Sequence, residues 1–241
     1  MKLKAIAVMA AAAALSLAMA GSALASPLSA KSKPAPQVTG TRLQSALLPS
    51  SAFGAGFTVT GHLNTGKKLW STKTRLKPSS LSCRNFAMFI YVGGFGNTAG
   101  AVDGVNNPNP DFANYPNIVV AGDQAVLQFK TTQAAASFYN QAYAKYKQCS
   151  AFTETLDNLQ LELTTSSLST TTTINKNKAF QLIQYADVAA LPVASEYLST
   201  AFVLSGTNVY TIDDVSGTND PISASLLRTF INRVQALYKH H

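Results

Sequence analysis

Histidine, cysteine and tryptophan are scarce in this chain, which contains three, two and one of them among 241 residues. His62 is the only histidine before the terminal His240 and His241. A Ser-His-Asp triad or a Cys-His pair therefore cannot be assembled with confidence from the sequence. We expect a protein that is not an enzyme, with no catalytic residues, no cofactor and no metal site.

Acidic residues are absent before Asp103. Residues 26–102 carry nine Lys and Arg, whereas the rest of the chain carries eight of them against eleven Asp and Glu. This asymmetry suggests contact with an anionic partner such as a wall polymer or a phospholipid headgroup. The alternative, which we favour, is that the basic segment packs beside the chain's own acidic remainder.

Two of the acidic residues, Asp213 and Asp214, are adjacent. On a strand they face opposite sides of the sheet, so they cannot act as a paired acid and base. Together with Asp220 they lack the spacing of a calcium loop. A turn followed by a helix cap accounts for all three, and the sequence shows no other pair of carboxylates with useful spacing.

The first 25 residues have the features of a cleavable export signal. Lys2 and Lys4 precede an apolar run over residues 5–19, and Ala23-Leu24-Ala25 forms a small-x-small cleavage site before Ser26. The run is too short to span a bilayer comfortably. No cysteine that could carry a lipid anchor follows the site. We expect a secreted, extracellular chain without a membrane span.

The remaining 216 residues are enough for one globular domain. Residues 26–40, rich in Pro, Ser and Lys, are expected to form a flexible leader. Residues 41–241 then form a single domain, which we expect to be monomeric.

Helices are expected in four places. An apolar stripe of Ala135, Phe138, Tyr139, Ala142 and Tyr146 predicts an amphipathic helix capped by Thr132. A second stripe predicts a terminal helix that begins with Asp220 as its cap and Pro221 as its first residue. Shorter helices are expected over residues 42–48 and 83–92. The Gly-, Asn- and Pro-rich residues 96–116 are expected to form a long surface loop.

Strands are expected over residues 119–130, in a short segment near Phe57 and in two hairpins. The first hairpin turns at residues 175–178 and the second at residues 205–208. Hairpins combined with amphipathic helices predict an α+β domain, in which helices cover a twisted antiparallel sheet.

The segment LQFKTTQAAASF at residues 127–138, continued by Tyr146-Lys147-Gln148-Cys149, resembles the strand–helix–cysteine signature of PknH-like extracellular sensor domains. This actinobacterial family includes secreted proteins and lipoproteins. The resemblance covers most of residues 41–238. The family pattern often has a second cysteine pair and a tryptophan near the cysteine matched by Cys149, and this chain has neither. The resemblance implies a sensor or binding module, with a cleft for a ligand, in the cell envelope.

The two cysteines, Cys83 and Cys149, have one intramolecular pairing available. An exported chain meets an oxidising environment, which favours a disulfide bond between them. Two buried free thiols are the alternative.

Aromatic and basic residues in segments rich in turn formers are the candidate ligand contacts: Trp70, Lys73, Arg75, Phe95 and Tyr115. Aromatic rings beside cations suit an anionic amphiphile or a cell-wall glycan. The alternative is that the rings fill gaps between loops and core.

Three functions remain open. The first is a non-catalytic extracellular sensor or binding domain for a small molecule, lipid or wall polymer, with no role in nucleic-acid binding. The second is a secreted hydrolase acting on cell-envelope material. The third is a surface interaction protein that binds through the basic N-terminal third.

Overall fold

The computed structural model describes residues 36–65, 95–107, 119–149, 151–156, 159–169, 172–188, 196–216 and 218–239. All of them belong to the second of two compact units, residues 34–241. The expected export signal and the expected helix over residues 83–92 lie outside the described residues. None of the helices in this described part is both long and apolar enough to cross a membrane.

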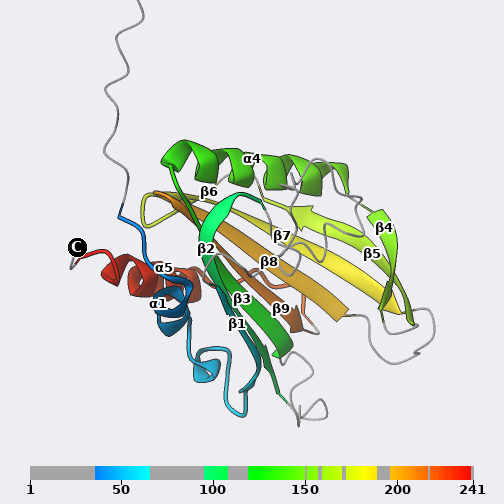
Figure 1. The fold of residues 1–241 in the computed structure, drawn as a ribbon. Coiled ribbons are helices and arrows are strands. Elements are labelled where there is room, and N and C mark those ends of the chain that lie inside the picture. The colour runs from blue at the N-terminus through cyan, green and yellow to red at the C-terminus, as the bar shows by residue number, and fades with distance from the viewer. Residues whose placement is uncertain are drawn as a thin grey trace, which may run out of the picture. The chain divides into compact units, whose positions relative to one another are not determined.

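The nine strands of the described residues form one antiparallel sheet (Figure 1), in the order β1-β2-β3-β9-β8-β7-β5-β4, with β6 paired to β7. Their bounds are β1 Thr58–Thr65, β2 Asn97–Asn106, β3 Val119–Phe129, β4 Ala151–Leu156, β5 Leu159–Leu168, β6 Thr172–Ile174, β7 Asn177–Val188, β8 Glu196–Ser205 and β9 Asn208–Ser216. The sheet and the helices packed on it confirm the α+β class.

Helices pack on both faces of this sheet (Figure 1). Helix α4, Thr132–Gln148, lies on one face over an apolar cluster from β2, β3, β7, β8 and β9. Helices α1, Gly40–Ser45, and α5, Ala224–Ala236, pack on the opposite face over a second cluster. A short 3-10 helix, η1 over Ser50–Ala52, follows α1.

Helix α4 matches the sequence prediction closely, but the predicted cap is wrong by one residue. Thr131, and not Thr132, is the cap, because its hydroxyl accepts a hydrogen bond from the Ala134 amide at 3.1 Å. The buried stripe contains all the expected residues: Ala135, Phe138, Tyr139, Ala142 and Tyr146. Beneath the helix, the rings of Phe180 and Phe202 stack with centroids 4.7 Å apart. Burial of this stripe fixes α4 on the sheet.

Helix α5 has the predicted apolar face, but its predicted N-terminus is wrong. Ser223, and not Asp220, is the cap, and its hydroxyl accepts from the Leu226 amide at 3.2 Å. Ile222 is buried just before this cap. The Asp220 carbonyl instead accepts a hydrogen bond from the Ser199 hydroxyl at 2.7 Å. Burial of Ile222 therefore places the helix start three residues later than the proline signal indicated.

The long loop predicted for residues 96–116 is also wrong in its first half. Residues 97–106 form β2, which pairs with both β1 and β3. Ala101, Val102 and Val105 are buried in this strand. The many small and polar residues of β2 hide the alternating apolar pattern expected of a strand. Glycine lets β2 approach β3 closely, because a Cβ atom on Gly100 would lie 3.2 Å from the Val126 carbonyl oxygen.

Both predicted hairpins are confirmed, each with a tighter turn than expected. Asn175 and Lys176 have φ angles of 48° and 64° and join β6 to β7. This left-handed pair is typical of a two-residue type I′ turn. Gly206, with φ 59°, and Thr207 join β8 to β9.

Two buried glutamines on β3 hold the segment around α1 against the sheet. Gln124 donates to the Leu48 carbonyl and accepts from the Leu48 amide, both at 2.7 Å. Gln128 forms the same reciprocal pair with Val38, at 2.9 and 3.1 Å. Val38, which lies within the predicted leader, is thus buried and bonded to the sheet.

Replacing Gln124 with leucine should lower the free energy of unfolding by about 2–4 kcal/mol. The substitution removes two hydrogen bonds and leaves the amide and carbonyl of the buried Leu48 unpaired. Urea unfolding measures the change. Gln133→Leu, at an exposed position on α4, is the matched control and should stay within about 0.5 kcal/mol of the wild type. Equal stability of both variants would show that the Gln124 hydrogen bonds contribute nothing.

Candidate ligand-binding site

Most of the residues predicted to contact a ligand lie outside the described part of the chain. These are Trp70, Lys73, Arg75 and Tyr115, so their role stays a prediction. Phe95 is described and is only 4% exposed. Its ring lies 5.1 Å from that of Phe138, within the apolar cluster under α4. This packing favours the gap-filling alternative for Phe95.

Cys149 ends helix α4 and is buried. No cysteine in the described ranges is a free thiol. Cys83 lies outside those ranges, so the bond between the two cysteines stays a prediction.

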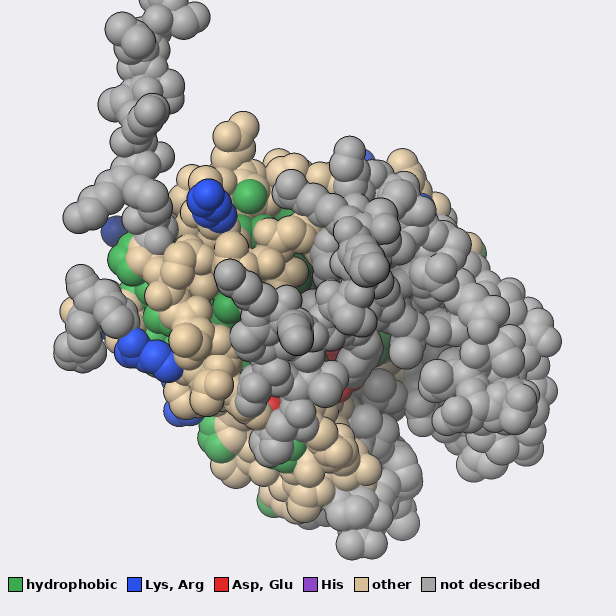
Figure 2. Space-filling view, in the orientation of Figure 1, with side chains coloured by type: hydrophobic (Ala, Val, Ile, Leu, Met, Phe, Trp, Pro, Cys, Tyr) green, Lys and Arg blue, Asp and Glu red, His purple; other side chains and the backbone are tan. Residues whose placement is uncertain are grey.

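A polar row crosses the middle of the sheet on the face that carries α4. Strand pairing sets Thr200 beside Asp213, Asp213 beside Asp123, and Asp123 beside Gly104. Residues directly opposite each other in an antiparallel pair point to the same face. We call these four residues the acidic row. Acidic atoms are visible near the middle of the space-filling view, whereas the visible Lys and Arg side chains lie toward its edge (Figure 2).

Glycine leaves room for a carboxylate in this row. A Cβ atom on Gly104 would lie 3.1 Å from Oδ1 of Asp123 and 2.9 Å from the Thr60 hydroxyl. A larger residue would therefore displace Asp123. The same contact confirms that Asp123 lies over β2 on the α4 face.

Burial dominates the electrostatics of Asp213. It raises the pKa of this carboxyl to about 8, with smaller contributions from the charges of Asp123 and Asp214. A hydrogen bond from Thr200 acts in the opposite direction. Because its pKa lies above 7, Asp213 is mostly protonated at neutral pH. It can then donate a hydrogen bond as well as accept one.

Several buried polar atoms near the row lack hydrogen-bond partners. They include Oδ1 of Asp213, the Thr211 hydroxyl and Nε2 of Gln184. Thr211 and Gln184 are only 1% and 2% exposed. Thr211 points to the same face as Asp213, because it lies two residues away on β9. Unpaired buried polar groups are costly, so a cluster of them marks a place where a ligand could supply the missing partners.

Tyr146 brings the C-terminal end of α4 to the acidic row. Its ring contacts Phe180 and Phe202, with centroids 6.0 and 5.6 Å apart. Burial raises the pKa of Tyr146, and the nearby charge of Asp213 adds to this effect. The Tyr146 ring therefore lies within range of the charge of Asp213 and in contact with the aromatic cluster under α4.

Asp214 lies on the opposite face, as the sequence predicted for adjacent strand residues. Burial raises its pKa to about 7, and the charge of Asp220 adds to the shift. Asp214 is therefore an internal control for Asp213. It is also a buried aspartate, but it does not belong to the acidic row.

No local pattern in the sequence reveals that two aspartates lie opposite each other in the sheet. Asp123 and Asp213 are 90 positions apart, yet β3 and β9 are neighbours and place them opposite each other. The available signal was the presence of acidic residues inside two strand segments, Asp123 in β3 and Asp213 with Asp214 in β9. No group of three or more His, Cys, Asp or Glu in the described ranges could hold a metal ion.

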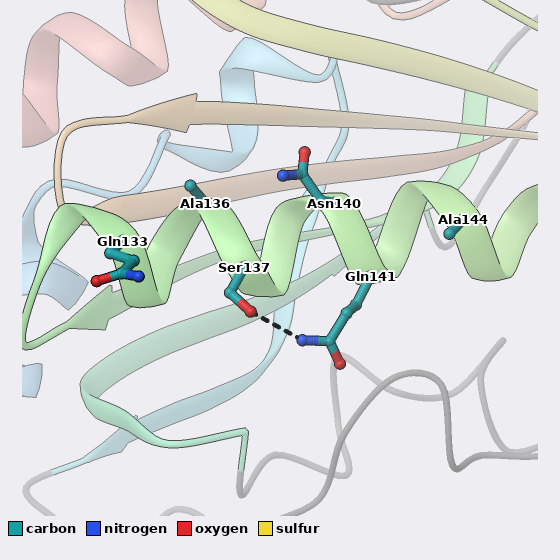
Figure 3. A pocket seen from close by; sticks show the side chains of 6 residues that line it. All are labelled: Gln133, Ala136, Ser137, Asn140, Gln141 and Ala144. Carbon is teal, nitrogen blue, oxygen red and sulfur yellow. Dashed lines mark hydrogen bonds between the residues drawn. The ribbon is translucent and has the colours of Figure 1, made fainter. Parts of the chain in front are cut away.

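A shallow groove of about 460 Å³ also runs along α4, lined by Gln133, Ala136, Ser137, Asn140, Gln141 and Ala144. Figure 3 shows these side chains and the hydrogen bond that Gln141 donates to Ser137 at 3.0 Å. All six residues come from one helix. They therefore do not converge from separate elements as the acidic row does, whose four residues come from the neighbouring strands β2, β3, β9 and β8.

Comparison with known proteins identifies the fold. No family model matches the chain, and a search of curated proteins finds no match. Among solved structures, the extracellular domain of PknH from Mycobacterium tuberculosis aligns with a TM-score of 0.60. The chain is similar to it in fold. The alignment covers 83% of this chain and 98% of the PknH domain, at 15% sequence identity. At this identity the likeness shows the fold alone.

Proposed function

We propose that this chain is a secreted, non-catalytic binding domain of the sensor type, whose ligand contacts the acidic row. The main observation that supports this proposal is the buried Asp213 carboxyl, which lies opposite Asp123 and has an oxygen without a hydrogen-bond partner. The fold likeness to an extracellular domain and the export signal predicted over residues 1–25 support the location.

The chemistry of the row indicates which part of a ligand binds there. Carboxyl oxygens accept hydrogen bonds from hydroxyl or amino groups, and a protonated Asp213 can also donate one. The Tyr146 ring, within range of the charge of Asp213, suits an apolar or sugar surface. An anionic head would find no counter-charge among the four residues of the row. If the ligand is an anionic amphiphile or glycan, its charge must contact other residues, for which Lys73 and Arg75 remain the prediction.

A bound molecule should accompany the protein through purification. We expect that denaturing the purified secreted protein releases a hydroxyl- or amino-bearing lipid or glycan, detected by liquid chromatography and mass spectrometry. The Asp213→Asn protein, prepared in parallel, should release less. Recovery of equal amounts of the bound molecule from both proteins would show that the acidic row does not contact it.

A hydrolase acting on cell-envelope material is the second candidate, and the carboxyl pair is the observation that favours it. A protonated Asp213 beside Asp123 could serve as a general acid next to a general base. Turnover of wall or lipid substrates that is lost in Asp213→Asn would establish this function. Binding without turnover would establish the sensor-type domain.

A further inference from the structure

One end of the sheet, where β3 finishes and the β6–β7 and β8–β9 turns lie, carries most of the exposed cations of the described chain. Strand register brings these points together, because Gln128 pairs with Asn208 and Lys178 pairs with Leu204. We call it the basic end and define it by six exposed side chains: Arg42, Lys130, Lys176, Lys178, Arg233 and Lys239.

Two side-chain hydrogen bonds place the last turns of α5 at the basic end. Asn175, in the β6–β7 turn, donates to Asn232 on α5 at 3.4 Å. Gln235, one turn further along the helix, donates to the hydroxyl of Ser205 at 3.0 Å. Figure 2 shows Lys and Arg side chains on the side of the molecule where Figure 1 places α1 and α5.

Backbone carbonyl groups hold two of the six cations in place. Arg233 donates from Nε to the Ala46 carbonyl at 3.0 Å, and Arg42 donates from Nη2 to the Leu237 carbonyl at 3.4 Å. A carbonyl group has no net charge. These bonds therefore fix the positions of the guanidinium groups without neutralising them.

Acidic residues are absent from the described elements that form the basic end. Helices α1 and α5 and residues 129–132, 174–178 and 205–208 contain no Asp or Glu. By register, Glu162, Asp187 and Glu196 lie on neighbouring strands toward the opposite end of the sheet. Nine positions along β7 separate Asp187 from Lys178, a distance of roughly 30 Å. The positive charge is therefore not offset locally by these residues.

The basic end is wider than a single small anion. Lys130 follows β3 and Lys176 lies between β6 and β7, and strands β9 and β8 separate β3 from β7. Four strand spacings correspond to about 19 Å. One phosphate ion could contact only part of this width. A molecule that carries several negative charges can contact several of the cations at once.

Exposed apolar side chains distinguish the two kinds of partner that carry many negative charges, a membrane surface and a linear polymer. Val59 is the only exposed large hydrophobic residue in the described ranges. It pairs with Val105 near the end of β2, at the opposite end of the sheet. The described part of the basic end thus has no large apolar side chain to insert among lipid chains, which favours a polymer.

We propose that the basic end is an interaction surface for a linear, phosphodiester-bearing polymer of the cell wall. Phosphodiester groups remain ionised at physiological pH, and Lys and Arg bind them through charge-assisted hydrogen bonds. The surface is separate from the acidic row, which crosses the middle of the sheet. Its setting in the cell wall rests on the extracellular location proposed above, but the binding itself does not.

Two double variants remove the same charge from different places. Lys130→Gln/Lys178→Gln removes two cations from the basic end. Lys145→Gln/Lys147→Gln removes two from the last turn of α4, about 20 Å along the helix from its first residue, Thr132. Both variants should melt as the wild type does, because surface substitutions have small effects on stability. Circular dichroism checks this.

Binding of fluorescently labelled poly(glycerol phosphate) to the full secreted chain is measured by anisotropy at low salt. We expect saturable binding by the wild type and Lys145→Gln/Lys147→Gln. The dissociation constant should be about tenfold larger for Lys130→Gln/Lys178→Gln, or about threefold for each lost contact. Binding should weaken at high salt, which screens exposed charges.

Three results would overturn the proposal. The first is no saturable binding of the polymer by the wild type. The second is equal weakening in the two double variants, which would show that only net charge matters. The third is binding to phosphatidylglycerol vesicles at least as tight as binding to the polymer, which would assign the surface to lipid headgroups.

Discussion

Replacing Asp213 with asparagine should raise the melting temperature at pH 8 by at least about 5 °C. Burial raises the pKa of this carboxyl from 3.8 to about 8, so the folded state retains a proton that the unfolded state releases. Stability is therefore highest below pH 4 and falls as the pH rises through 8. The expected loss is on the order of several kcal/mol, and a neutral asparagine avoids it.

Thermal melts from pH 4 to 9 measure this effect. The melting temperature of the wild type should fall between pH 7 and 8, and most of this fall should be absent from the Asp213→Asn protein. The Asp214→Asn protein should retain that decline, because the pKa of Asp214 is about 7 and its own contribution is largely complete there. Parallel curves for wild type and Asp213→Asn would show that Asp213 titrates normally and is not held protonated by the fold.

Reducing the predicted Cys83–Cys149 bond should lower the free energy of unfolding by about 4 kcal/mol. The bond would close a long loop that ends at Cys149, at the C-terminus of α4. Removing that constraint increases the conformational entropy of the unfolded chain. Tyr146, one turn earlier, lies within range of the charge of Asp213, so reduction should also weaken ligand binding.

Denaturant unfolding with and without dithiothreitol gives the size of this effect. A Cys83→Ser/Cys149→Ser double variant should match the reduced protein and show no response to the reductant. Thiol titration of the unfolded, unreduced protein should find no free thiol. Two reactive thiols would refute the bond.

Short sequence patterns predicted the helices and turns whose conformation depends mainly on neighbouring residues. The stripes of α4 and α5 and the two hairpin turns are encoded within short windows, and tertiary packing agrees with them. Strand β2 could not be found in this way. Its Gly100 and Gly104 are required for close approach to β1 and β3, but in sequence they are typical of a loop.

The acidic row depends on strand order, which no local pattern contains. Asp123 and Asp213 meet only because β3 and β9 pair across 90 positions. The sequence did show that Asp213 and Asp214 face opposite sides, and this remains correct. The partner of Asp213 lies on a neighbouring strand and not beside it in the sequence, so a pattern around residue 213 does not contain it.

The role of the acidic row in ligand binding is the central claim, and native mass spectrometry of three secreted proteins tests it most directly. The wild type and Asp214→Asn should each carry the same additional mass of a bound molecule. Asp213→Asn, changed by one residue on the other face, should be detected mainly as the bare chain. A bound mass retained equally by Asp213→Asn, or lost only from Asp214→Asn, would contradict the account.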